Sequence, residues 1–120
     1  MDGRHIKAVG QGDPAAMSST KKVEQFLVEL VARVGMRVLG SPHVYREDHG
    51  GVSGIVVLST SHVAVHTRIR KVKEVTYGFF TLDLYSCRTF TDEPVKETLE
   101  EFFAAATVKI TDLSESLIGP

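Results

Sequence analysis

Several features that would direct a chain to a particular class of protein are scarce or missing here. There is no tryptophan and a single cysteine, Cys87, so no internal disulfide can form. This cysteine usage fits a reducing cytoplasm. The uninterrupted apolar runs are far shorter than the roughly 18 residues needed to cross a bilayer, so we expect no membrane span. Residues 1–5 hold no apolar segment, and we therefore expect no signal peptide.

Neither sign of charge dominates the sequence. Fourteen Lys and Arg stand against fifteen Asp and Glu, a formal charge of −1. No net field therefore draws the chain to nucleic acid or to anionic lipid. The 120 residues, 42% of them hydrophobic, suit one globular domain over 1–120. A chain of this length buries a modest core, which favours dimerisation.

Residue periodicity predicts two helices and six strands. Apolar side chains recur at helical spacing near 20–34 and 93–106, preceded by Ser, Thr and acidic residues typical of a helix start. Segments rich in β-branched or alternating apolar residues predict strands over 6–9, 36–39, 52–58, 63–67, 76–85 and 108–110. We expect Gly40-Ser41-Pro42 to end the second strand and residues 10–14 to form a loop. This order predicts an α+β two-layer sandwich, a mostly antiparallel sheet with both helices on one face.

The segment over residues 51–67 is the densest in reactive side chains, with Ser53, Ser61, His62 and His66 on strands and their turn. Cys87 with His62 or His66 could form a nucleophilic pair. A metal held by His62 and His66 is disfavoured, because their spacing separates them by about 13 Å along a strand. The simplest alternative is that these side chains only satisfy hydrogen bonds on half-buried strands.

A family resemblance bears on this choice. The chain contains Gly51-Val52-Ser53-Gly54, then Ser61-His62, Val63-Ala64-Val65-His66-Thr67 and Asp83-Leu84-Tyr85-Ser86-Cys87. In order and spacing these motifs resemble the short prokaryotic class of S-adenosylmethionine decarboxylase, pyruvoyl enzymes of polyamine (spermidine) synthesis. Gly3-Arg4-His5 is similar to the usual start of that family. The resemblance covers nearly the whole chain and implies a homodimer.

The resemblance also implies residue roles. Ser61 would attack the carbonyl of Thr60, and cleavage into 1–60 and 61–120 would leave a self-derived pyruvoyl group at position 61. Ser53 would assist the acyl shift, and His66 would remove the Cα proton of Ser61. Cys87 would donate a proton to the decarboxylated substrate, which the pyruvoyl carbonyl holds as a Schiff base. Ser61 and His66 differ by an odd number of positions, so one regular strand would place them on opposite faces. We expect a turn at 60–62 to remove this obstacle.

The chain departs from the family pattern where substrate is recognised. Arg68-Ile69-Arg70 stands where the family has Trp-Pro-Glu, Thr60 where Glu is common, and Arg88 where Gly is common. Tyr45 is the nearest candidate for a base-stacking aromatic, and Arg68 is a second candidate for substrate binding.

The departures leave the substrate open. We expect S-adenosylmethionine, with arginine or ornithine as the alternative basic amino acids. The non-catalytic alternative is an unprocessed homologue that only binds a small ligand or a partner subunit. None of these hypotheses requires a metal ion.

Overall fold

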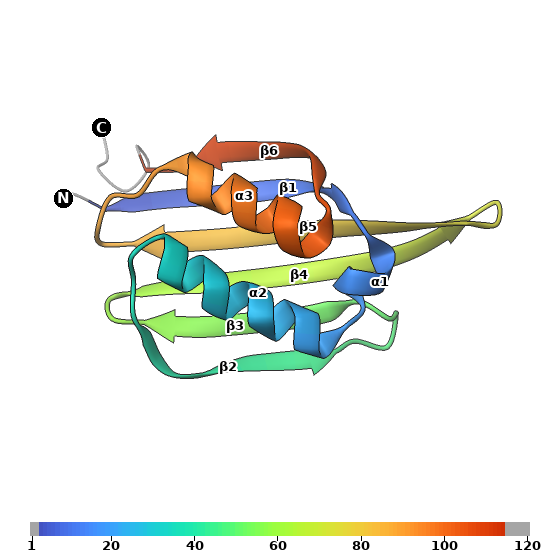
Figure 1. Cartoon of the computed structure of the whole chain (residues 1–120), viewed down its shortest axis with the longest axis horizontal. Helices are drawn as coiled ribbons and strands as arrows, with labels where there is room; N and C mark the ends of the chain where they lie inside the picture. Colours follow the sequence, from blue (N-terminus) through green and yellow to red (C-terminus); the bar gives the residue numbers. More distant parts are fainter. Residues whose placement is uncertain (1–2, 115–120) are drawn as a thin grey trace.

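The computed structural model describes residues 3–114, which form one six-stranded sheet with its helices on one face (Figure 1). All the paired strands are antiparallel, in the spatial order β2-β3-β4-β5-β1-β6. The strands are β1 (Arg4–Gly12), β2 (Val38–Arg46), β3 (Val52–Leu58), β4 (Ser61–Val72), β5 (Val75–Ser86) and β6 (Ala106–Asp112). The helices are α1 (Pro14–Met17), α2 (Thr20–Arg33) and α3 (Asp92–Phe103). This architecture confirms the predicted α+β two-layer sandwich.

The alternation of side chains along the central strands separates a covered face from an open face of the sheet. On β4, Val63, Val65 and Thr67 are buried beneath the helices, while the side chains at even-numbered positions face the other way. Strand β3 and residues 78–86 of β5 follow the same rule, with a strict alternation of buried and more accessible residues. Helices α2 and α3 lie over the covered face (Figure 1), so the opposite face is open.

Local capping determines where the long helices begin and end. The Ser19 hydroxyl accepts a hydrogen bond from the Lys22 amide at the start of α2, and Gly35 follows its end with φ 75°. Helix α3 begins after Thr91 with Asp92 and Glu93 in its first turn. The observed starts of α2 and α3 and the end of α2 confirm the helix boundaries predicted near 20, 93 and 34.

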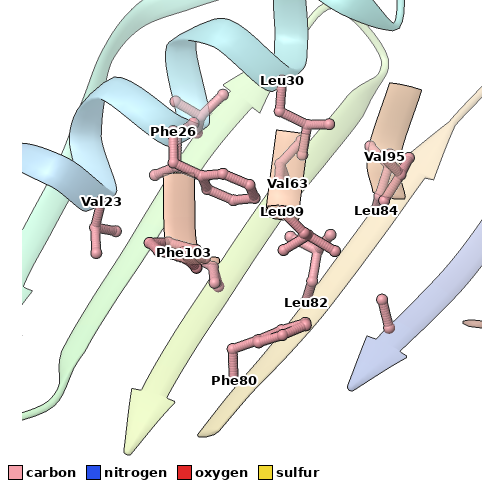
Figure 2. Close-up of a cluster of buried hydrophobic side chains, with 14 of the residues drawn as sticks. Val23, Phe26, Leu30, Val63, Phe80, Leu82, Leu84, Val95, Leu99 and Phe103 are labelled. Atoms are coloured by element: carbon pink, nitrogen blue, oxygen red, sulfur yellow. The ribbon is translucent and has the colours of Figure 1, made fainter. Parts of the chain in front are cut away.

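The core lies between the two long helices and the covered face of the sheet. Phe26 of α2 packs on Phe103 of α3 with ring centroids 4.6 Å apart, and both rings are fully buried. Figure 2 shows Val63, Leu82 and Leu84 of the sheet pointing into the same cluster. This packing holds α2 and α3 against the sheet.

Several predicted boundaries were wrong; the strand predicted over 63–67, for example, is β4, Ser61–Val72. Helix α3 ends at Phe103 rather than near 106, because Ala104 adopts a left-handed φ of 49° and Ala106 belongs to β6. Strand β2 continues through Gly40-Ser41-Pro42 by means of an irregularity in its pairing with β3 between Leu39 and His43. The predicted loop over 10–14 is instead the end of β1 and the start of α1, which Asp13 caps.

The basic segment that follows His66 forms a hairpin. Strands β4 and β5 continue to Val72 and from Val75, and the two residues between them, Lys73 and Glu74, have φ of 49° and 69°. Positive φ at both positions suits a tight hairpin turn. Figure 1 shows this hairpin extending beyond the rest of the sheet. None of the helices over residues 3–114 has the length and hydropathy needed to cross a membrane.

Candidate active site

The turn between β3 and β4 holds an unusual backbone conformation. Leu58 pairs with Ser61, so Ser59 and Thr60 alone form the turn. Thr60 has a φ of 63°, which is costly for a β-branched residue. Left-handed strain of this kind costs on the order of 1–3 kcal/mol and clusters at functional sites. The strained residue is the one that carries the carbonyl joined to Ser61.

Cys87 lies directly against this turn. Its Sγ is 2.6 Å from Thr60 Oγ1, and its backbone N–H donates to Ser61 Oγ over 3.2 Å. The thiol is exposed, as is Thr60. Residues 59–61 and 86–88 line a hollow of ≈ 600 Å³ together with residues 35–37, which follow α2. We call it the turn hollow; it gives a small molecule access to Thr60, Ser61 and Cys87 at once.

Ser53 and His66 form a second group on the open face. They oppose each other on β3 and β4, and Ser53 Oγ is 2.8 Å from His66 Nδ1. They line a hollow of ≈ 510 Å³ whose wall includes Arg68 and Arg70. We call it the arginine hollow; Glu47, His49, Thr67, Phe79, Phe80 and Thr81 complete its lining. A hydroxyl bonded to an imidazole can relay a proton to a molecule bound there.

Tyr45 lies beside this second group. It opposes Ser53 on β2, and its side chain is 66% exposed. Tyr45, Ser53 and His66 share a smaller hollow of ≈ 190 Å³. The two predicted substrate-binding residues, Tyr45 and Arg68, therefore accompany His66 rather than Ser61.

The two groups are separate within one chain. Ser61 and His66 lie five positions apart on β4, which corresponds to about 16 Å at ~3.3 Å per residue. Ser61 lies in register with the covered-face residues Val63 and Val65, whereas His66 is on the open face. The expected turn at 60–62 was wrong: Ser61 is already part of the strand, so the opposite-face placement remains.

A third group was missed by the sequence analysis. The Asp83 carboxylate on β5 accepts from His62 Nε2 at 2.9 Å and from His5 Nε2 at 3.0 Å. Partial burial alone would raise the pKa of Asp83, but the hydrogen bonds from His62 and His5 outweigh it, and the pKa lies below its ordinary value. The Gly3-Arg4-His5 motif was the available signal, but only the pairing of β1 with β5 shows what His5 contacts.

Residues 3–114 contain no candidate metal site. Among residues 3–114, no three His, Cys, Asp or Glu side chains lie together in a way that could hold a metal ion. The polar side-chain groups at the two hollows are hydroxyls, a thiol, imidazoles, guanidiniums and the carboxylate of Glu47.

Comparison with known proteins assigns the chain to a family. The family model described as S-adenosylmethionine decarboxylase matches residues 6–116, which include all three groups except His5. The chain belongs to the S-adenosylmethionine decarboxylase family.

Individual relatives agree with this assignment at modest identity. A protein of Thermococcus onnurineus is 31% identical over 80 residues, covering 67% of this chain and 52% of its own length. One of Pyrococcus horikoshii is 27% identical over 117 residues, covering 96% and 79%. One of Moorella thermoacetica is 29% identical over 120 residues, covering 98% and 90%. All three are named S-adenosylmethionine decarboxylase proenzyme. The match spans about half the length of the Thermococcus onnurineus protein.

Proposed function

We propose that this protein is a pyruvoyl-dependent decarboxylase that cleaves its own chain between Thr60 and Ser61 and then acts on S-adenosylmethionine. The observation that carries the proposal is the left-handed Thr60 next to Ser61, with Cys87 in hydrogen-bond contact with both. The names of the relatives, which are proenzymes, support the self-processing part. The same names support the substrate.

The cleavage needs only atoms of this chain and one water molecule. Ser61 Oγ adds to the Thr60 carbonyl carbon, the C–N bond breaks, and the peptide becomes an ester with a free amine on Ser61. Loss of the Ser61 Cα proton then expels the Thr60 carboxylate and leaves a dehydroalanine. Tautomerisation and hydrolysis release ammonia and leave a ketone at the start of fragment 61–120. Strain at Thr60 is relieved as its carbonyl carbon becomes tetrahedral, which lowers the barrier to the first step.

The residues around Ser61 suit a pyruvoyl group at this position. Residue 61 opens into the turn hollow, and the exposed Cys87 thiol lies against the same turn. A pyruvoyl group supplies an electron sink for the carbon that loses carbon dioxide. The Cys87 thiol lines the same hollow and can serve as the proton source, and the Cys87 N–H would hold an oxygen at residue 61.

The role proposed for His66 calls for a second copy of the chain. A general base must come within hydrogen-bond reach of the proton it removes, and about 16 Å along β4 separates His66 from Ser61. A homodimer in which Ser53 and His66 of one copy approach Ser61 of the other satisfies this requirement. Co-expression of Ser61→Ala and His66→Ala chains tests it, because only a shared site allows the His66→Ala chain to be cleaved.

The arginine hollow bears on the choice of substrate. Guanidinium groups bind carboxylates in a bidentate manner, so Arg68 and Arg70 suit the carboxyl end of an amino-acid substrate. All three candidate substrates carry a carboxylate and a positive charge, which in S-adenosylmethionine is the sulfonium, so the guanidiniums do not distinguish between them. The exposed Tyr45 beside Ser53 offers a ring face for an adenine.

Release of labelled carbon dioxide from S-adenosylmethionine, arginine and ornithine tests the substrate. Processed protein should release it from S-adenosylmethionine alone, and the Ser61→Ala variant should release it from none. Release from arginine or ornithine would replace the substrate and keep the reaction class. An uncleaved, inactive chain would favour a binding protein without catalytic activity.

A further inference from the structure

Four side chains of the open sheet face form a cluster that the proposed reaction does not use. His5 of β1 and His62 of β4 both oppose Tyr85 of β5, and the Asp83 carboxylate bonds to both imidazoles. The ring centroids of His5 and His62 lie 5.8 Å and 6.0 Å from that of Tyr85. We call these residues the histidine cluster; it joins three adjacent strands through a single carboxylate.

The histidine cluster lies next to the proposed cleavage point. His62 follows Ser61 directly, and cleavage after Thr60 would make Ser61 the first residue of β4 and of its fragment. Chain ends fray unless something ties them down. On the open face of the sheet, the hydrogen bond from His62 to Asp83 ties the residue beside this new end to the neighbouring strand β5.

The histidine cluster also joins the two proposed fragments. His5 belongs to residues 1–60, whereas His62 and Asp83 belong to 61–120, so the His5 bond would persist between separate chains after cleavage. Hydrogen bonds to an ionised carboxylate are shorter and stronger than neutral ones. Both imidazoles present Nε2 to the same oxygen, Asp83 Oδ1, which requires a proton on each Nε2.

We propose that His62 is a positioning residue for the reaction at Ser61, held in place by Asp83 and His5. A fixed His62 side chain restrains the backbone of the neighbouring Ser61 and keeps Ser61 Oγ against the Cys87 N–H. Before cleavage the restraint acts on Ser61 Oγ; after cleavage, when that oxygen has left with the Thr60 carboxylate, it acts on the backbone of the new chain end at residue 61. This inference rests on the proposed function.

Paired substitutions separate positioning from stability. His62→Phe keeps a ring beside Tyr85 but cannot donate to Asp83, whereas His62→Gln can still donate. Asp83→Asn keeps the accepting oxygen and removes the charge. The matched control is Asp112→Asn, which removes another carboxylate that joins the two proposed fragments, here through Arg4, with no contact to His62.

Each purified variant is followed for self-cleavage on a denaturing gel, with its melting temperature measured in parallel. Cleavage should slow about tenfold in His62→Phe and Asp83→Asn, which corresponds to about 1.4 kcal/mol. It should stay within about threefold of the original rate in His62→Gln and in Asp112→Asn. A lowered melting temperature in Asp112→Asn with unchanged cleavage would support positioning.

Three results would overturn the inference, and they are distinguishable. Cleavage of His62→Phe and Asp83→Asn at the original rate would reject the positioning role and leave the proposed function intact. An unmodified protein that does not cleave would reject the proposed function and this inference with it. Equal slowing in Asp112→Asn would reduce the histidine cluster to a contribution to stability and reject positioning.

Discussion

Replacing Thr60 by glycine tests whether backbone strain drives the proposed self-cleavage. Thr60 has a φ of 63°, a region that glycine enters without cost and a β-branched residue does not. The substitution should remove about 1–2 kcal/mol of strain from the uncleaved chain. If that strain is released as the Thr60 carbonyl becomes tetrahedral, cleavage should slow by roughly 5- to 30-fold.

Two further variants separate strain from other effects of the substitution. Thr107→Gly makes the same change at a φ of 54°, and both hydroxyls donate to the preceding carbonyl, at Ser59 O and Ala106 O. Because Thr107 lies on β6, away from the turn hollow, this variant should cleave at the original rate. Thr60→Val keeps the branched side chain and removes the contact with Cys87 Sγ, so it should cleave at least as fast as the original.

The assay is a time course of refolding from denaturant, with intact and cleaved chains resolved on a denaturing gel. Each variant gives a first-order rate constant, and circular dichroism verifies that it has refolded. Thr60→Gly cleaving as fast as the original chain would refute the strain argument. Thr60→Val slowing as much as Thr60→Gly would assign the effect to the hydroxyl and thiol contact instead.

The remaining predictions concern assembly, substrate binding and pH. Strand β1 of fragment 1–60 lies between β5 and β6 of fragment 61–120, so the cleaved halves should co-elute in size-exclusion chromatography and separate only in denaturant; separate elution without denaturant would contradict this interlocking. Tyr45→Ala should raise KM for S-adenosylmethionine by about 2- to 10-fold with kcat unchanged, from the loss of about 0.5–1.5 kcal/mol of stacking; an unchanged KM would exclude Tyr45 from the substrate site. The pKa of Asp83 lies below its ordinary value of 3.8, so its ionised form stabilises the fold above that pH, and the stabilisation is lost as the pH falls through the lowered pKa. The melting temperatures of the original protein and of Asp83→Asn should therefore differ at neutral pH and converge below pH 3.8, whereas a difference that persists in acid would contradict this assignment.

Local patterns in the sequence were sufficient for the layered fold. The strict alternation in β3, the alternation over 63–68 of β4 and the helical spacing in α2 each depend on neighbours within one element, which a sequence displays directly. Gly40-Ser41-Pro42 misled the prediction because these residues usually end a strand, whereas here an irregular pairing with β3 carries β2 through them. The end of α3 depends on the left-handed Ala104, which no sequence signal marks.

The candidate site was only partly accessible to sequence reasoning. The family resemblance placed Ser61 and Cys87 in one site, and the pairing of β4 with β5 brings them together. Because Ser61 and His66 lie on one strand and differ by an odd number of positions, His66 lies on the opposite face of the sheet. The predicted turn at 60–62 led the sequence analysis to set this placement aside. The histidine cluster depends on β1 entering the sheet beside β5, which brings His5 and Asp83, 78 positions apart in the sequence, into hydrogen-bond contact. Such long-range pairing is set by the whole sheet and leaves no local pattern.

The mass of the purified chain after long incubation tests the central claim most directly. Self-processing predicts two fragments, 1–60 and 61–120, with the second lighter by one ammonia than a peptide that begins with serine. That fragment alone should react with a hydrazine, and the Ser61→Ala variant should stay at the full 13.2 kDa. A single unreactive species at 13.2 kDa from the original sequence would contradict the pyruvoyl enzyme.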